Sequence, residues 1–282
     1  MDVLWDLKIP QSIIRKQNHD GSWTYPTRRA SISVDYDQVE TYRQLGFLIE
    51  MFGLNREHPS IEKAAEYVFS KQTPAGDFRG IYANQYTPNY TAALLELLIK
   101  TGYESDERIL KTFAWLNSVR QNDGGWALAF RTQNRNLDTI YRNKDQLDLN
   151  KDRPFSHLIT GVILRAYAAH PRFKNSEIAK DATKLLVSRF FERDVYPDRN
   201  HKDDWTRFSF PFWQTDILSS LDIVGIIEPD LANHQKVLEA KQWFIDMQLP
   251  DGLFAGHLLK DCYHDLQLWY SYAICRAFNR LS

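Results

Sequence analysis

The sequence predicts an all-α protein, a toroid of about five to six helix pairs arranged as an inner and an outer ring. Three observations predict this fold class. A glutamine–glycine–aromatic motif recurs along the chain, amphipathic helical patterns alternate with apolar ones, and alternating strand patterns are scarce. Units that each form one helix pair bury their apolar faces by packing on their neighbours. We therefore expect a single toroidal domain over residues 1–282.

The repeated motif places a glycine four residues after a glutamine and an aromatic residue six residues after it. The last interval between copies is more than twice as long as the others, so we expect a degraded copy between Phe190 and Trp205. We interpret the motif residues as scaffold. The clear copies are Gln17–Trp23, Gln72–Phe78 and Gln248–Phe254, with Gln121–Trp126 one residue shorter.

Each motif copy separates two kinds of helical pattern. Before the motif, apolar residues recur on one face, and we expect Ser60 and Ser105 to cap two of these outer helices. Glycine after the last turn ends a helix at little cost, because it accepts a left-handed conformation. The helices after the motif are apolar on nearly all sides, which predicts burial on both sides. We expect them over 90–100, 156–169, 212–227 and 263–278.

Residues 131–154 interrupt the repeat. This stretch is charged and has little periodicity, which predicts a long polar loop insertion. Loops of this length are either surface or disordered segments or lids over functional sites. Both interpretations stay open from the sequence.

Composition and charge exclude several classes of protein. The formal net charge is −1 and basic tracts are absent from the sequence, so nucleic-acid binding is not expected. No apolar run reaches the roughly 20 residues of a membrane span, and the first residues do not resemble a signal peptide. Cys262 and Cys275 are too far apart on one predicted helix for a disulfide. We expect a cytoplasmic protein, and a homodimer or peripheral membrane contact is compatible with it.

The motif resembles the repeat of squalene and oxidosqualene cyclases, which the β-subunits of protein prenyltransferases share. The resemblance covers almost the whole chain and implies an α/α toroid. In that superfamily the glutamine ties the helix end to the turn, and the aromatic ring stacks on it. The resemblance therefore predicts the fold, whereas the same fold serves several functions.

A second resemblance bears on whether the protein has a zinc site. The segment 261–264 is similar to the stretch of prenyltransferase β-subunits whose histidine binds zinc, and 210–214 matches the landmark that follows their other two ligands. Arg207 and Ser209 stand at those two ligand positions, and neither is a suitable zinc ligand. We predict no zinc site, no other metal and no cofactor. His264 remains a catalytic candidate with Asp261, and Asp265 is a binding candidate beside it.

Asp35-Tyr36-Asp37-Gln38 resembles the Asp-x-Asp-Asp acid motif of class II terpene cyclases, with Gln38 in place of the third acid. Those enzymes protonate an alkene or an epoxide, which requires a carboxylic acid above an apolar, water-free cavity. The resemblance implies that Asp37 and Asp35 are catalytic. The alternative is that one of them caps the following helix.

Aromatic residues gather near the expected starts of the inner helices. Aromatic faces stabilise carbocations and also stack on sugar rings, so these residues are candidates for a cavity wall. Polar residues in the same regions complete the set. The substrate-binding candidates are Tyr36, Tyr42, Tyr86, Tyr90, His157, Arg207, Phe212, Trp213, Asp216, Asp265 and Trp269.

Three functions follow from these patterns. The first is an isoprenoid-handling protein, either a terpene-cyclase-like enzyme that starts cyclisation with an acid or a polyprenyl-binding protein. The second is a carbohydrate-active or sugar-binding toroid, with Asp203, Asp204, Arg207 and Asp216 in its site. The third is an interaction scaffold without a pocket. The sequence leaves open whether the protein is an enzyme.

Overall fold

The fold is described from a computed structural model, which covers residues 4–27, 34–142, 145–198, 200–209, 214–258 and 266–282. The chain divides into two compact units. Unit 1 comprises Met1–Arg120 and Ala127–Arg153, and unit 2 comprises Gln121–Trp126 and Pro154–Ser282. The toroid of one domain stays a prediction, and each unit is described by itself.

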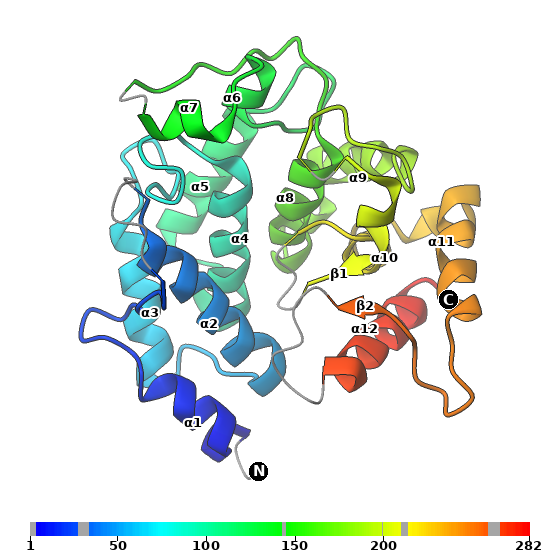
Figure 1. The fold of residues 1–282 in the computed structure, drawn as a ribbon, viewed down its shortest axis with the longest axis horizontal. Coiled ribbons are helices and arrows are strands. Elements are labelled where there is room, and N and C mark those ends of the chain that lie inside the picture. The colour runs from blue at the N-terminus through cyan, green and yellow to red at the C-terminus, as the bar shows by residue number, and fades with distance from the viewer. Residues whose placement is uncertain (1–3, 28–33, 143–144, 199, 210–213, 259–265) are drawn as a thin grey trace. The chain divides into compact units, whose positions relative to one another are not determined.

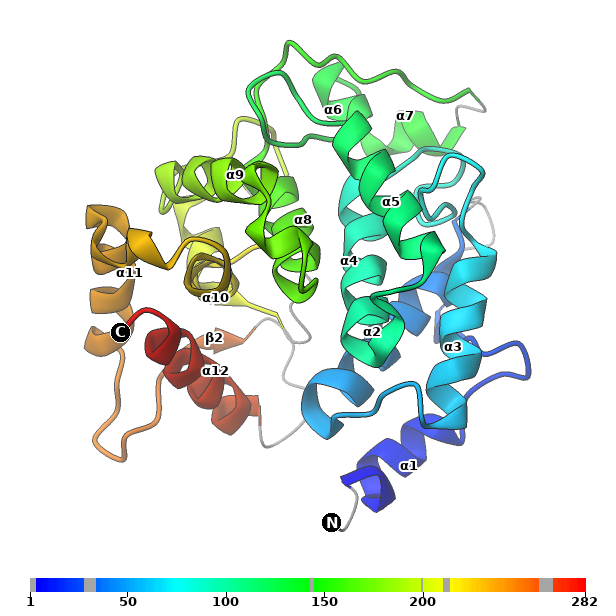
Figure 2. The ribbon, with the colours of Figure 1, turned by 180° about the vertical axis from the view of Figure 1, so that it is seen from behind.

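Unit 1 is built around helices α2 and α4, which pack on each other. Helices α1 and α3 contact α2, and α5 contacts α4 (Figures 1 and 2). Two short helices, α6 and α7, follow the third motif copy. The elements are η1 (Leu4–Asp6), α1 (Lys8–Ile14), α2 (Tyr36–Phe52), α3 (Pro59–Ser70), α4 (Pro88–Leu98), the π-helical turn η2 (Ile99–Tyr103), α5 (Glu107–Ser118), α6 (Ala129–Thr132) and α7 (Leu137–Arg142).

Unit 2 is centred on α10, which contacts α8, α9, α11 and α12. The strands β1 and β2 are two residues long and pair in parallel, Arg207 with His257 and Phe208 with Leu258. The elements are α8 (His157–Ala169), η3 (Phe173–Asn175), α9 (Glu177–Ser188), η4 (Lys202–Thr206), β1 (Arg207–Phe208), α10 (Ile217–Ile227), η5 (Pro229–Asn233), α11 (Gln235–Asp246), β2 (His257–Leu258) and α12 (Leu266–Arg280).

The predicted alternation of amphipathic and apolar helices is confirmed in both units. Helices α3, α5 and α9 bury one face and expose charged residues on the other. Helices α4, α8 and α10 are buried along most of their length. Among the described helices, none is at once long and apolar enough to cross a bilayer.

The glutamines of the first two motif copies join neighbouring outer helices. The side-chain Nε2 of Gln17 donates to the carbonyl of Gly21 in its own turn (2.9 Å) and to that of Ser60 at the start of α3 (2.8 Å). The Nε2 of Gln72 donates to the carbonyl of Arg108 at the start of α5 (2.8 Å) and to the hydroxyl of Thr112 (2.8 Å). Each amide therefore satisfies carbonyl groups of its own turn and of the next helix.

The motif aromatics join the turn to the inner helix by a backbone bond. In all four clear copies the N–H of the aromatic residue donates to a threonine or serine hydroxyl of the following apolar helix, over 3.0–3.2 Å. The rings themselves are buried in the core. The pairs are Trp23 with Thr41, Phe78 with Thr91, Trp126 with Thr160, and Phe254 with Ser271.

The motif glycine is required at the turn for two reasons. Gly21 and Gly76 have φ values of +93° and +112°, which L side chains rarely adopt. A Cβ on Gly76 would also lie 2.7 Å from the carbonyl oxygen of Lys111, and a Cβ on Gly21 would lie 2.2 Å from that of Lys63. The turn therefore packs on the next outer helix through bare backbone.

Three local expectations were wrong in detail. The caps of α3 and α5 are His58 and Asp106, each one or two residues from the predicted serine. Ser60 instead bonds the Gln17 side chain. Helix α10 begins at Ile217 rather than at 212, because Asp216 caps it. Residues 210–213 lie outside the described residues.

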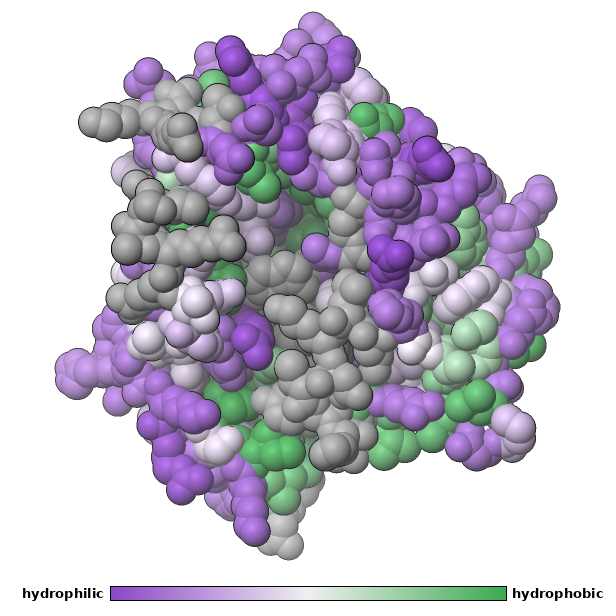
Figure 3. Space-filling model, in the orientation of Figure 1, coloured by the Kyte–Doolittle hydropathy of each residue, from purple (hydrophilic) through white to green (hydrophobic). Residues whose placement is uncertain are grey.

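The interrupted parts of the repeat have a clear structure. Phe190 follows α9 at the position where Gln72 and Gln248 follow α3 and α11, and its buried ring packs on Trp205 with a centroid distance of 5.4 Å. The segment 131–154 is a loop only in part, because it contains α7. Its surface is mostly hydrophilic (upper edge in Figure 3).

We expect Gln72→Ala to destabilise the fold by about 1–3 kcal/mol, since it removes the hydrogen bonds that Nε2 donates to the Arg108 carbonyl and to the Thr112 hydroxyl. Urea unfolding followed by circular dichroism measures the change. Gln248→Ala is the matched control, because the exposed Gln248 amide donates to Gly252 of its own turn. Equal losses for both variants would contradict the proposed role in joining helices.

Candidate functional site

The Asp35 carboxylate is fixed at the start of α2 by its own helix and by the end of α3. It caps the helix by accepting from the N–H of Gln38 (3.0 Å), and it forms an ion pair with the Nζ of Lys71 (2.8 Å). The phenol of Tyr67 donates to it over 3.4 Å. The capping alternative therefore holds for Asp35, which is also the anion of an ion pair with the end of α3.

Asp37 lies in the first turn of α2 and is held from the first motif turn. Its Oδ1 accepts from the N–H of Tyr25 (3.0 Å), two residues after Trp23. Its carbonyl accepts from the Thr41 hydroxyl (2.7 Å), the same hydroxyl that binds the Trp23 N–H. The motif turn thus fixes the position of the second carboxylate of the acid-motif segment.

Burial raises the pKa of two phenols in unit 1, those of Tyr67 and Tyr86. Burial, with the negative charge of Asp35 next in size, raises the pKa of Tyr67 far above its usual range. Burial and then the charge of Asp148 raise the pKa of Tyr86 to about 12. Both phenols stay protonated in neutral solution, so each serves as a hydrogen-bond donor.

An aromatic cluster forms at the start of α4. The ring of Tyr82 makes edge contacts with Tyr90 (5.3 Å between centroids), Phe130 (5.9 Å) and Tyr141 (6.4 Å). Burial raises the pKa of Tyr90 well above its ordinary value, with smaller effects from Tyr82, Tyr141 and Tyr42. Tyr82, Phe130 and Tyr141 were not predicted, because they lie in the second motif loop, α6 and α7 rather than at inner-helix starts.

The other predicted aromatics of unit 1 are Tyr36, Tyr42 and Tyr86, and each has its own surroundings. Tyr42 is buried in α2. Tyr36 packs on Tyr25 at 5.2 Å. Tyr86 makes an edge contact with Trp115 at 5.7 Å. The loop of residues 145–153 is tied to the same region, because the Gln85 side chain bonds the backbone of Asp145 and Leu147.

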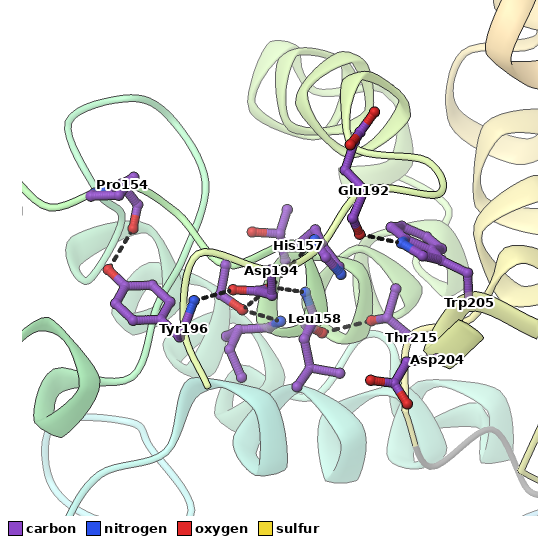
Figure 4. Close-up of polar contacts among 12 residues, drawn as sticks. Pro154, His157, Leu158, Glu192, Asp194, Tyr196, Asp204, Trp205 and Thr215 are labelled. Carbon is purple, nitrogen blue, oxygen red and sulfur yellow. Dashed lines mark hydrogen bonds and ion pairs between the residues drawn. The ribbon is translucent and has the colours of Figure 1, made fainter. Parts of the chain in front are cut away.

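In unit 2, a buried carboxylate organises the start of α8 (Figure 4). Asp194 accepts from the hydroxyl of Ser156 (2.8 Å) and from the N–H groups of Leu158 (3.1 Å) and Tyr196 (3.0 Å). The Nδ1 of His157 lies 3.4 Å from the same carboxylate. The three donors hold the Asp194 carboxylate at the N-terminus of α8.

His157 is held between this carboxylate and an indole. Its ring stacks on Trp205 with a centroid distance of 4.6 Å and an interplanar angle of 27°. Trp205 is itself fixed, because its Nε1 donates to the carbonyl of Glu192 (2.8 Å). The predicted candidate His157 is therefore buried, with one ring face on Trp205 and its Nδ1 near Asp194, and both partners come from the 189–206 segment (Figure 4).

The remaining predicted residues of unit 2 serve different local roles. Asp216 is fully buried and caps α10 together with Ser219. Arg207 lies on β1, partly exposed, 3.4 Å from Asp204. Trp269 makes an edge contact with Tyr272 at 6.2 Å. Among the described residues, no group of three or more side chains has the composition of a metal site.

Five predicted residues lie outside the described residues, and their roles stay predictions. They are Phe212, Trp213, Asp261, His264 and Asp265.

Comparison with known proteins shows which families and structures this chain resembles. Residues 29–137, which include the start of α2, match the family model of the squalene-hopene cyclase C-terminal domain. A type II terpene cyclase, MstE from Scytonema, matches 95% of this chain and 73% of its own, with a TM-score of 0.55 and 16% identity. The chain thus has the fold of the matched cyclase, and residues 29–137 are similar to a squalene-hopene cyclase domain. The predicted all-α fold and the resemblance to cyclases are confirmed.

Two further findings concern the ligands bound in the MstE structures and a longer relative of known sequence. The matched MstE structure contains its substrate, geranylgeranyl dihydroxybenzoate, and a second one, with a TM-score of 0.56 and 15% identity, contains its product, merosterolic acid A. The terpene cyclase–glycosyl transferase fusion protein fsoA of Humicola fuscoatra is 27% identical over 141 residues. That match covers 40% of this chain and 10% of fsoA.

We expect Asp194→Asn to destabilise the protein by roughly 2–4 kcal/mol, because a neutral amide replaces an anion that accepts from three donors. Thermal unfolding measures the loss. The exposed Asp181→Asn on α9 is the control and should change stability by less than about 0.5 kcal/mol. A loss no greater than that of the control would show that the Asp194 network is unimportant for folding.

Proposed function

We propose that the protein catalyses acid-initiated cyclisation of an isoprenoid chain. The observation that carries this proposal is the pair of carboxylates at the start of α2, Asp35 as its cap and Asp37 in its first turn, inside the segment that matches the squalene-hopene cyclase model. The structural neighbours that bind geranylgeranyl dihydroxybenzoate as substrate and merosterolic acid A as product support an isoprenoid ligand.

The two carboxylates have different proposed roles. Asp35 is paired with Lys71 and accepts from Tyr67 and the Gln38 backbone, so we assign it to positioning the turn as an anion. We assign the proton donor to Asp37, which the Tyr25 N–H holds. A proton from Asp37 to the end of the chain creates a carbocation, and the next double bond attacks it.

The aromatic cluster of Tyr82, Tyr90, Phe130 and Tyr141 suits the later steps. Aromatic faces attract cations by about 0.5–2 kcal/mol per ring where water is excluded. The phenol of Tyr90 remains neutral, since burial raises its pKa. Neutral rings stabilise a cation by their faces without capturing it as a covalent adduct.

The test is incubation with geranylgeraniol, geranylgeranyl dihydroxybenzoate and squalene, followed by mass spectrometry for isomers of the substrate. We expect Asp37→Asn to lower the rate of cyclisation by about 10²–10⁴-fold, since the amide cannot donate the proton as an acid. The exposed Asp230→Asn is the matched control and should keep the rate of the unaltered protein. Absence of cyclised product from every substrate, or full activity of Asp37→Asn, would refute the assignment.

A further inference from the structure

The outward face of α11 carries large apolar side chains. The helix packs on the rest of unit 2 through Val237, Ala240 and Phe244, which are buried. On its other side Leu238 is 46% exposed and Ile245 is 50% exposed. Figure 3 shows apolar surface in green at the right edge of the view, where α11 lies in Figure 1. Since the two side chains are seven residues apart, they share one stripe of the helix.

The repeat shows what covers this end of an outer helix elsewhere in the chain. Phe69, three residues before the motif Gln72, is 5% exposed, because the start of α5 packs over its ring. Ile245 stands at the same distance before Gln248, yet it is exposed. A Cβ on Gly252 in that turn would meet nothing within 4 Å among the described residues. The end of α11 therefore presents a surface that a helix covers in the second motif copy.

The exposed residues of α11 follow the spacing of a two-stranded coiled coil. Gln235, Leu238, Gln242 and Ile245 lie three, four and three residues apart, and all four are exposed. This is an a-d-a-d pattern, in which the residues at d form an apolar seam and a polar residue at a sets the register of the pair. The helix is already folded in the free chain, so pairing requires no new helix nucleus. The pattern suits a second helix of the same kind.

The charges beside the seam distinguish the two possible directions of a second α11. Glu239 and Asp246 occupy e positions, whereas His234 and Lys241 occupy g positions. In a parallel pair each g residue approaches an e residue of the other helix, so Lys241 of one copy meets Asp246 of the other. In an antiparallel pair the acidic e positions would face each other and repel. The charge pattern therefore matches a parallel α11 from a second copy of the chain.

The glutamines of the seam hold both acids in place for this contact. The Nε2 of Gln242 donates to the carboxylate of Asp246 (2.7 Å), and the Nε2 of Gln235 donates to that of Glu239 (2.9 Å). The Nζ of Lys241 lies 3.4 Å from a carbonyl at the C-terminal end of the chain. A carboxylate accepts several hydrogen bonds, so each acid keeps acceptor capacity for a partner's cation. Because the acids are already oriented, pairing costs little side-chain freedom.

We propose that α11 is an interface at which two copies of the chain pair in parallel. Leu238 and Ile245 of both copies form its apolar seam, and Lys241 and Asp246 form ion pairs along its edges. A seam of this length buries less than the roughly 1,200 Å² of a standard interface, so the dimer is weak, with a Kd of about 10–100 µM. The inference is independent of the proposed cyclisation.

Sedimentation of the full chain between about 1 and 300 µM tests the pairing. We expect Ile245→Asp to raise the Kd of the dimer at least about tenfold, because it places a carboxylate from each copy in the seam. Leu110→Asp is the matched control, since Leu110 is an exposed leucine in unit 1, and it should change the Kd less than about twofold. A chain that stays monomeric throughout, or equal effects of the two variants, would overturn the inference.

Charge reversal tests the direction of the two helices. Lys241→Glu should raise the Kd about threefold to tenfold, because it places two acids beside each other at both edges of the seam. Adding Asp246→Lys should restore the Kd, since the ion pairs form again with their charges exchanged. A double variant as weak as Lys241→Glu alone would contradict the parallel arrangement.

A disulfide gives a second measure of direction that does not depend on affinity. Gln235→Cys, with Cys262→Ser and Cys275→Ser in the background, puts a thiol at an a position, where parallel helices come within disulfide distance. We expect a cross-linked dimer after mild oxidation. The thiols of an antiparallel pair would lie at opposite ends of the seam, so a lack of cross-linking would overturn the inference. A monomer that sediments instead with vesicles of phosphatidylcholine and phosphatidylserine would assign the face to a membrane and refute the dimer.

Discussion

The fold depends on one repeated connection between an outer helix, a turn and an inner helix. Where the glutamine amide reaches the next outer helix, as at Gln17 and Gln72, it satisfies carbonyl groups at the start of that helix. The N–H of the motif aromatic bonds a hydroxyl one turn inside the following buried helix. The hydroxyl gives the motif N–H a partner in the core, and the glutamine adds a bond to the helix-start carbonyl, so the connection both ends one helix and orients the next.

The same connection positions the proposed chemistry. Thr41 accepts from the N–H of Trp23 and donates to the carbonyl of Asp37. Two residues after Trp23, the Tyr25 N–H binds the Asp37 carboxylate. A scaffold bond and a bond to the proposed acid therefore come from one short segment. The second motif turn contributes Lys71 to Asp35 in a similar way.

Buried polar groups divide into two kinds in this protein. Asp194 is surrounded by donors and stabilises the 189–206 segment on the start of α8. Gln38 is buried to the same degree, yet its amide is unsatisfied among the described residues. Folding explains the first kind, because the hydrogen bonds offset the cost of burial. No such bonds offset the burial of the Gln38 amide among the described residues.

The sequence by itself determined the all-α class, the alternation of exposed and buried helices and the position of every clear motif copy. These features are local, since helical periodicity and a glycine with positive φ are encoded within a few residues. Only the tertiary structure decided which side chains meet. Lys71 and Tyr67 reach Asp35 from α3, and Tyr141 reaches Tyr82 from a segment predicted to be loop. Such contacts join residues more than thirty positions apart, so no spacing in the sequence encodes them, and they arise when the buried faces of the helices pack.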